Sequence, residues 1–165
     1  ELGRSIEYYP TGTGATMKEL GEGSRDMIVS TTGWDINPRV LGIVPKSAAI
    51  QTLKGFHWVS DAQFMFVPKG LADEKMAVLL ELIKWVLSPA QQAYTYDEGY
   101  FYPGPAVKDV PLSMAPPESQ AAIREFGRPE YDKLIAEVPV ETPVDPDKMV
   151  KAFRPWDEEI GSRRT

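Results

Sequence analysis

The stretch that decides the fold is AQFMFVPKGLADEKMAVLLELIKWVLSP, residues 62–89. Its apolar run at 64–67 stops at a proline, which predicts a buried strand. Apolar side chains then repeat at helical spacing through residues 71–88, at Met76, Leu79, Leu80, Ile83, Val86 and Leu87, and Val78, Leu82 and Trp85 widen the apolar face. Since only a narrow polar stripe is left, we expect a helix that is buried on most sides.

Composition bounds the class of protein. The chain has 165 residues, 42% of them hydrophobic and 25% charged, which is typical of a globular domain. The net charge of −6 argues against a nucleic-acid partner, because phosphate binding needs a basic face. There is no cysteine and a single histidine, His57, so thiol catalysis and a histidine metal cluster are not expected. The longest apolar segment is too short to span a bilayer.

The order of predicted elements indicates an α/β fold with a helical C-terminal portion. Apolar segments at residues 5–10, 26–32, 50–55 and 62–68 predict strands, and residues 11–23 predict a glycine turn followed by a helix. Ser88 and Pro89 predict the start of another helix that ends at Gly99. Recurrent prolines then separate short helices expected near residues 117–126, 130–137 and 147–160.

Two short motifs are candidate binding sites. TGTGAT, residues 11–16, places glycines before a helix N-terminus, where backbone N–H groups from Thr13 to Thr16 favour an anion; a plain glycine turn with a threonine cap explains it equally. STTGWD, residues 30–35, places Trp34 and Asp35 beyond a strand end, where open α/β sheets bind ligands. An aromatic face with an acid suits an amine, although Trp34 folded onto the core is the alternative.

No catalytic constellation is recognisable. A serine–histidine–acid triad needs a nucleophile motif such as G-x-S-x-G, which the sequence does not contain. The consecutive acids at residues 157–159 are typical of a solvated helix face. We therefore expect a protein that is not an enzyme and needs no cofactor or metal.

Several motifs, taken in order, resemble the C-terminal half of bacterial periplasmic solute-binding proteins of ABC transporters, with the spermidine/putrescine-like group closest. They run from residue 6 to residue 111. The positions that carry the resemblance are Gly21, Glu22 and Asp26; Val67, Pro68, Lys69 and Gly70; Leu87, Ser88, Pro89 and Gln92; and Gly99, Tyr100 and Pro103. Family members have an aromatic and an acid two positions apart before the closing strand, whereas Trp58 and Asp61 here stand three apart.

The resemblance implies a periplasmic-binding-protein-like (type II) two-lobed clamp. Residues 1–45 would belong to the second lobe, and residues 46–165 would cross the hinge and complete the first lobe. The abrupt start of the chain suggests a missing N-terminal half or a partner chain that completes the fold. The implied ligand contacts are Thr13, Gly14, Ala15, Thr16, Gly33, Trp34, Asp35, Trp58, Asp61 and Gln63.

The resemblance also implies a periplasmic or lipid-anchored extracellular receptor. It would close on a small polar or cationic solute, such as a polyamine, and deliver it to an inner-membrane ABC permease. Two alternatives stay open. One is an enzyme on the same clamp that uses Asp35, His57 and Asp61. A His57 exposed in the cleft with a carboxylate in reach would favour it, and a buried His57 bonded to backbone would disfavour it. The other is a helical interaction module without a ligand, favoured if no cleft lies between residues 30–35 and 56–63.

Overall fold

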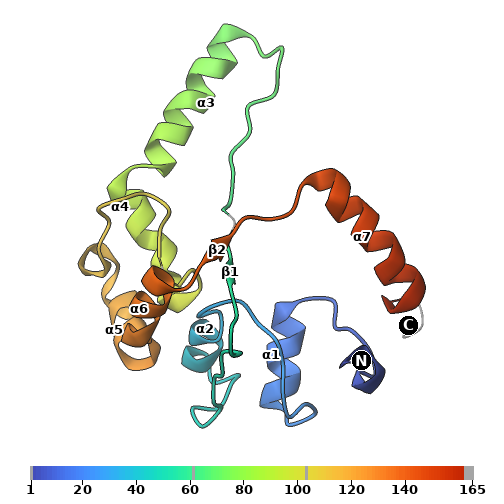
Figure 1. Ribbon diagram of the computed structural model, residues 1–165. Coiled ribbons are helices and arrows are strands. Elements are labelled where there is room, and N and C mark those ends of the chain that lie inside the picture. The colour runs from blue at the N-terminus through green and yellow to red at the C-terminus, as the bar shows by residue number, and fades with distance from the viewer. Residues whose placement is uncertain (1, 61, 103, 162–165) are drawn as a thin grey trace.

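The computed structural model describes residues 2–60, 62–102 and 104–161, and it is mainly helical (Figure 1). Short 3-10 helices occur as η1 (Leu2–Ser5), η2 (Ala93–Gly99) and η3 (Leu112–Met114). The α-helices are α1 (Thr13–Gly21), α2 (Ile36–Val40), α3 (Asp73–Val86), α4 (Pro89–Gln92), α5 (Pro117–Phe126), α6 (Pro129–Glu137) and α7 (Pro146–Glu159). None of the described helices is long and apolar enough to cross a bilayer.

The helices predicted from prolines and periodicity are confirmed, except that the helix expected from Pro89 to Gly99 is α-helical only through Gln92 and continues as the kinked 3-10 helix η2. Proline occupies the first turn of α4, α5, α6 and α7, where its fixed φ suits a helix and its missing N–H is not needed. The Asp145 side chain accepts a hydrogen bond from the backbone N–H of Asp147, which caps α7. At α4, by contrast, the Ser88 hydroxyl donates to the Trp85 carbonyl and gives no side-chain cap.

The packed part of the molecule is built from α2, α5 and η2. Ile36 of α2 is fully buried, and Ala93 and Tyr96 of η2 and Ala122 of α5 are also buried. The Tyr96 hydroxyl donates to the Val110 carbonyl across 2.9 Å, so the chain after η2 is held against it. Residues 33–45 thus pack on the C-terminal helices, across the predicted lobe boundary at residue 45.

The only strands among the described residues are β1 (Trp58–Val59) and β2 (Val140–Glu141). They form a parallel pair in which Trp58 lies opposite Val140. The backbone N–H of Trp58 donates to the Pro139 carbonyl at 3.0 Å, and that of Ser60 donates to the Glu141 carbonyl at 3.2 Å. This pair joins the segment before α3 to the segment after α6 (Figure 1).

The strands expected at residues 5–10, 26–32, 50–55 and 62–68 are wrong for this structure. Their described residues carry no strand assignment, and residues 62–67 lie on the long extended path between β1 and α3 (Figure 1). Their apolar side chains are exposed, for example Met27 at 80%, Val29 at 86% and Phe66 at 85%. The physical reason is that a strand needs neighbouring backbone to satisfy its N–H and C=O groups, and none of the described segments lies alongside as a strand.

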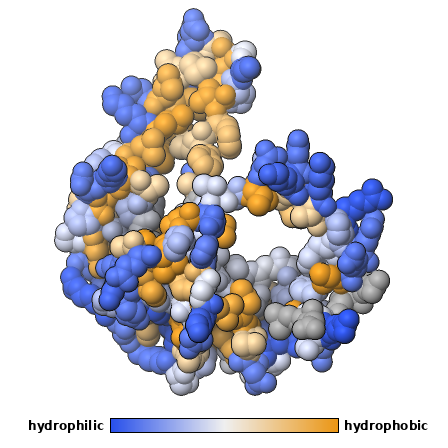
Figure 2. Space-filling view, viewed as in Figure 1, coloured by the Kyte–Doolittle hydropathy of each residue, from blue (hydrophilic) through white to orange (hydrophobic). Residues whose placement is uncertain are grey.

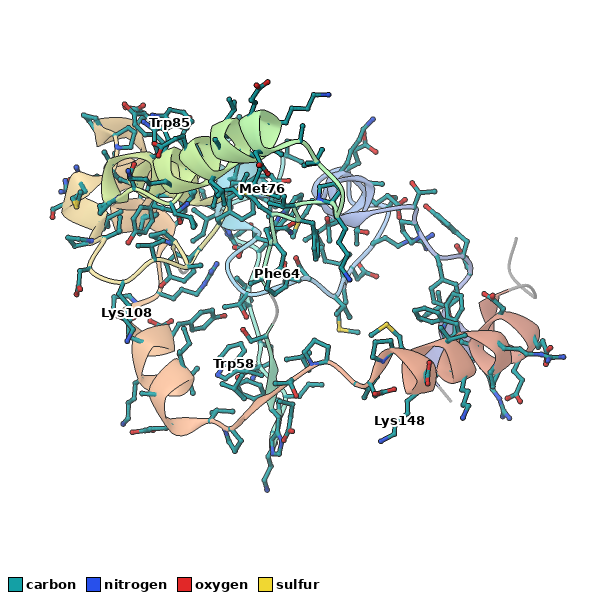
Figure 3. The ribbon with its side chains drawn as sticks, turned by 90° about the horizontal axis from the view of Figure 1, so that it is seen from above. Trp58, Phe64, Met76, Trp85, Lys108 and Lys148 are labelled. Carbon is teal, nitrogen blue, oxygen red and sulfur yellow. The ribbon has the colours of Figure 1, made fainter. Side chains whose placement is uncertain are left out.

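The expectation that residues 71–88 form a helix is confirmed as α3, but its predicted burial is wrong. None of its residues is buried, and Val78 and Trp85 are 70% and 57% exposed. The helix stands away from the packed body, and its apolar side chains show as orange along the arm in Figure 2. Met76 and Trp85 lie along this helix in Figure 3. The helix has an apolar surface typical of a buried element without a partner to cover it.

The surface area of the chain agrees with these exposed segments. The solvent-accessible surface is 12660 Å² for a mass of 18.4 kDa, whereas a folded monomer of that mass exposes about 8,200 Å². The excess is about 4,500 Å², well above what one partner buries in a standard protein–protein interface, about 800 Å². The excess exposed area is therefore comparable to the area that is buried within part of a domain core.

We predict that Gly99→Ala destabilises the packed body by about 3 kcal/mol. Gly99 has φ +87, and an added Cβ would lie 2.1 Å from Cγ2 of the buried Ile36. Gly42→Ala is the matched control, since Gly42 has φ +70 but nothing within 4 Å, so only the backbone strain of about 1 kcal/mol is expected. Urea unfolding followed by tryptophan fluorescence measures both. Equal losses in the two variants would contradict the packing described for Ile36.

Candidate functional site

Asp35 is the centre of a buried ion cluster. It directly precedes α2, and Gly33 before it has φ +73 and lies so close to Tyr102 that a Cβ would be 2.4 Å from the ring. The Asp35 Oδ2 atom accepts a hydrogen bond from Arg39 Nε at 2.6 Å and a second one from Arg128 Nη2. The side chains of Asp35, Arg39 and Arg128 are only 11%, 6% and 13% exposed. One carboxylate thus joins two guanidinium groups with little water around them.

Arg39 fastens the loop that follows α2. Its Nη1 donates to the carbonyls of Pro45 and Lys46, both at 3.1 Å, and its Nη2 donates to the Ala48 carbonyl at 2.7 Å. These charge-assisted bonds satisfy carbonyls of the loop, which explains how a segment without regular structure holds its place. The chain at residues 48–52 is thereby fixed as one wall of a cavity.

Arg128 comes from the turn between α5 and α6, 93 residues after Asp35. Its guanidinium lies 5.4 Å from the centre of the Tyr131 ring, in cation–π contact. Its Nη1 is buried and has no hydrogen-bond partner among the described residues. The Tyr102 hydroxyl donates to the Arg128 carbonyl at 3.2 Å, so the same turn is also held from the loop after η2.

A cavity of about 450 Å³ lies between these elements. One wall comes from Arg39 and the chain at 48–52, and the other comes from the end of α5 and the beginning of α6. Its lining residues are Arg39, Ala48, Ile50, Gln51, Thr52, Glu125, Phe126, Arg128, Glu130, Tyr131 and Leu134. The lining combines two guanidinium groups with apolar and aromatic side chains, as small-molecule sites commonly do.

Trp58 supports the α6 wall of this cavity. Its Nε1 donates to the Leu134 carbonyl at 3.1 Å, and its ring lies 6.3 Å from Tyr131 and 4.8 Å from Phe56 between centroids. Figure 3 shows the side chain of Trp58, on β1, near the helix α6. Asp35 and Trp58, which belong to separate sequence motifs, therefore both contact residues that line one cavity.

Burial affects the tyrosines next to the cluster. It raises the pKa of Tyr131 above its usual value, and the charge of Arg128 opposes that rise. Burial also raises the pKa of Tyr102, opposed by the hydrogen bond from the Arg128 backbone N–H. Both phenols are therefore neutral near pH 7 and leave the excess positive charge of the cluster uncompensated.

The other predicted contacts lie elsewhere. Thr13, Gly14 and Ala15 are exposed on the first turn of α1, and the Thr16 hydroxyl donates to the Gly12 carbonyl at 3.0 Å. Gln63 is exposed on the extended path before α3, and Asp61 lies outside the described residues. Trp34 is half-buried with its ring edge-on to Tyr100 at 5.5 Å, so it packs on the loop after η2.

His57 lies away from the cavity lining. Its Nδ1 is 2.8 Å from Oε1 of Glu141 on β2, and the two side chains are 51% and 58% exposed. The pair joins the β1 and β2 segments at the surface. Among the described residues, no group of three or more metal-binding side chains is assembled.

Comparison with protein-family models, with curated proteins and with solved structures finds no match for this chain. The two residues that complete the site, Arg39 and Arg128, were not predicted from the sequence. Arg39 stands four positions after Asp35, which is the spacing of a helical ion pair, so this pair could have been predicted from the sequence. No local pattern marks Arg128.

We predict that Asp35→Asn lowers the free energy of unfolding by about 3 kcal/mol, because it leaves two buried guanidinium groups without a counter-charge. Asp26→Asn is the control, since Asp26 is an exposed acid outside the cluster, and a change of under about 0.5 kcal/mol is expected for it. Urea unfolding compares the two variants. If Asp35→Asn unfolds at the same urea concentration as Asp26→Asn, the cluster does not hold the fold together.

Proposed function

We propose that the chain is the C-terminal portion of a two-lobed, type II solute receptor that serves an ABC importer outside the cytoplasm. The observation that carries the proposal is that Asp35 and Trp58 both contact residues that line one cavity. The two residues lie in separate sequence motifs, both of which the resemblance to such receptors places among the ligand contacts. A receptor of this kind binds its solute and passes it to a permease without changing it chemically.

The uncovered apolar surface supports the proposed completion of the fold by further polypeptide. Residues 27–31 and 62–67 have the composition of buried strands but lack strand neighbours among the described residues, and no residue of α3 is buried. Strands from another part of the protein would pair with both segments and leave α3 packed on the resulting sheet. The excess area of about 4,500 Å² is large enough for this role.

The proposed binding event is closure of the lobes around the cavity region. The walls meet through the Asp35–Arg128 ion pair and the Lys46–Glu125 ion pair, each of which joins the chain before residue 47 to the α5–α6 region. Since both guanidinium groups already bind the Asp35 carboxylate, a small polar solute fits the site better than an amine held by Asp35. Polyamine binding would have to use other acids.

We expect calorimetry with a panel of polyamines, amino acids and carboxylates to find a binding solute for the longer protein that carries this chain. Trp58→Ala should weaken that binding about tenfold, because Trp58 holds Tyr131 and Leu134 in place. Trp156→Ala is the matched control, since Trp156 packs on Tyr9, away from the cavity lining. If a well-folded longer protein binds no solute of the panel, the receptor proposal fails.

A further inference from the structure

The ion cluster beside the cavity contains one more positive charge than negative charges. Arg39 and Arg128 both bind the same oxygen of Asp35, and all three side chains are nearly buried. A charge that is removed from water is stable only if it is paired and hydrogen-bonded. The cluster on its own therefore leaves a single positive charge without a partner at the edge of a cavity.

Arg128 is the guanidinium of this cluster whose hydrogen bonds are incomplete. Every nitrogen of the Arg39 guanidinium donates at least one hydrogen bond, to Asp35 or to the carbonyls of residues 45, 46 and 48. Arg128 uses Nη2 for Asp35, while its Nη1 is buried with no partner among the described residues. Native structures leave few buried donors unpaired, and such a donor calls for an explanation. An acceptor that a ligand brings into the cavity provides one.

The two acids of the cavity lining do not neutralise Arg128. Glu125 is 54% exposed and pairs with Lys46, and Glu130 is exposed on the first turn of α6. No contact of either carboxylate with Arg128 is among the hydrogen bonds or ion pairs of the described residues. These two acids do make the mouth of the cavity unfavourable for an ion with several negative charges.

We infer that the cavity binds a small molecule with one carboxylate attached to an apolar body. The carboxylate would pair with Arg128, and the apolar body would lie against Ile50, Phe126 and Leu134, which line the same cavity. A single negative charge balances the cluster, whereas a phosphate dianion would exceed it and meet Glu125 and Glu130. The inference rests on the proposed function for the identity of the transported solute.

The test uses the 165-residue chain itself, because all the lining residues belong to it. Equilibrium dialysis measures the binding of hexanoate, hexylammonium, hexanol and inorganic phosphate. We expect hexanoate to bind at least tenfold more tightly than each of the other three. Equal binding of hexanoate, hexylammonium and hexanol would show only adhesion to exposed apolar surface and would overturn the inference, as would preferred binding of phosphate or of the amine.

Variants locate the site. Arg128→Gln should weaken hexanoate binding about tenfold or more, while Arg124→Gln, which removes an exposed guanidinium outside the lining, should not. Ile50→Asp adds a repelling charge at a partly exposed wall position, and Ile50→Asn is its neutral match, so this pair decides the matter even if Arg128→Gln fails to fold. Unchanged affinity in Ile50→Asp relative to Ile50→Asn would overturn the site.

The results separate this inference from the receptor proposal. If the longer protein binds a solute of another class, and hexanoate binding is absent from the chain, the receptor stands and the carboxylate site falls. If hexanoate binds at Arg128 and no solute binds the longer protein, the site stands without the receptor. Failure of both experiments removes both proposals.

Discussion

The shared carboxylate of Asp35 is the interaction on which the rest of the packed body depends. It fixes α2 through Arg39, and Arg39 in turn fixes the chain at residues 45–48 by three hydrogen bonds to backbone carbonyls. The bond from Arg128 brings the α5–α6 turn to the same point. Three segments are thus held together by one buried charge cluster, in addition to the apolar packing around Ile36 and Ala122. The cavity lies between the walls that this cluster joins.

The second constraint is that the chain buries too little of its apolar surface. The helices α2, η2 and α5 bury apolar side chains against one another. In contrast, α3 and the segments at residues 27–31 and 62–67 leave apolar side chains exposed to water. Hydrophobic burial is the main favourable contribution to folding, so such surfaces are unfavourable unless something covers them. These segments have the apolar composition of buried elements but are exposed. This combination is the physical basis for proposing that further polypeptide completes the fold.

Local signals in the sequence predicted the local structure well. Prolines at helix starts and apolar periodicity identified α3, α5, α6 and α7, because a helix closes its hydrogen bonds within one segment. Strands could not be assigned in the same way, since pairing depends on distant segments. Among the described residues only Trp58–Val59 and Val140–Glu141 pair. The site shows the same division between local and distant signals. A motif identified Asp35 and its neighbour Trp34, and the i,i+4 spacing from Asp35 could have identified Arg39. Arg128 could not be identified in this way, because it lies 93 residues after Asp35.

Hydrogen–deuterium exchange tests the central claim most directly, because it reports backbone pairing segment by segment. In the 165-residue chain alone, the account predicts rapid exchange of the amides at 27–31 and 62–67 and slow exchange in α5. In the longer protein that we propose, the same two segments should become as protected as α5. Protection of residues 27–31 and 62–67 in the isolated chain, or their continued rapid exchange in the longer protein, would contradict the account.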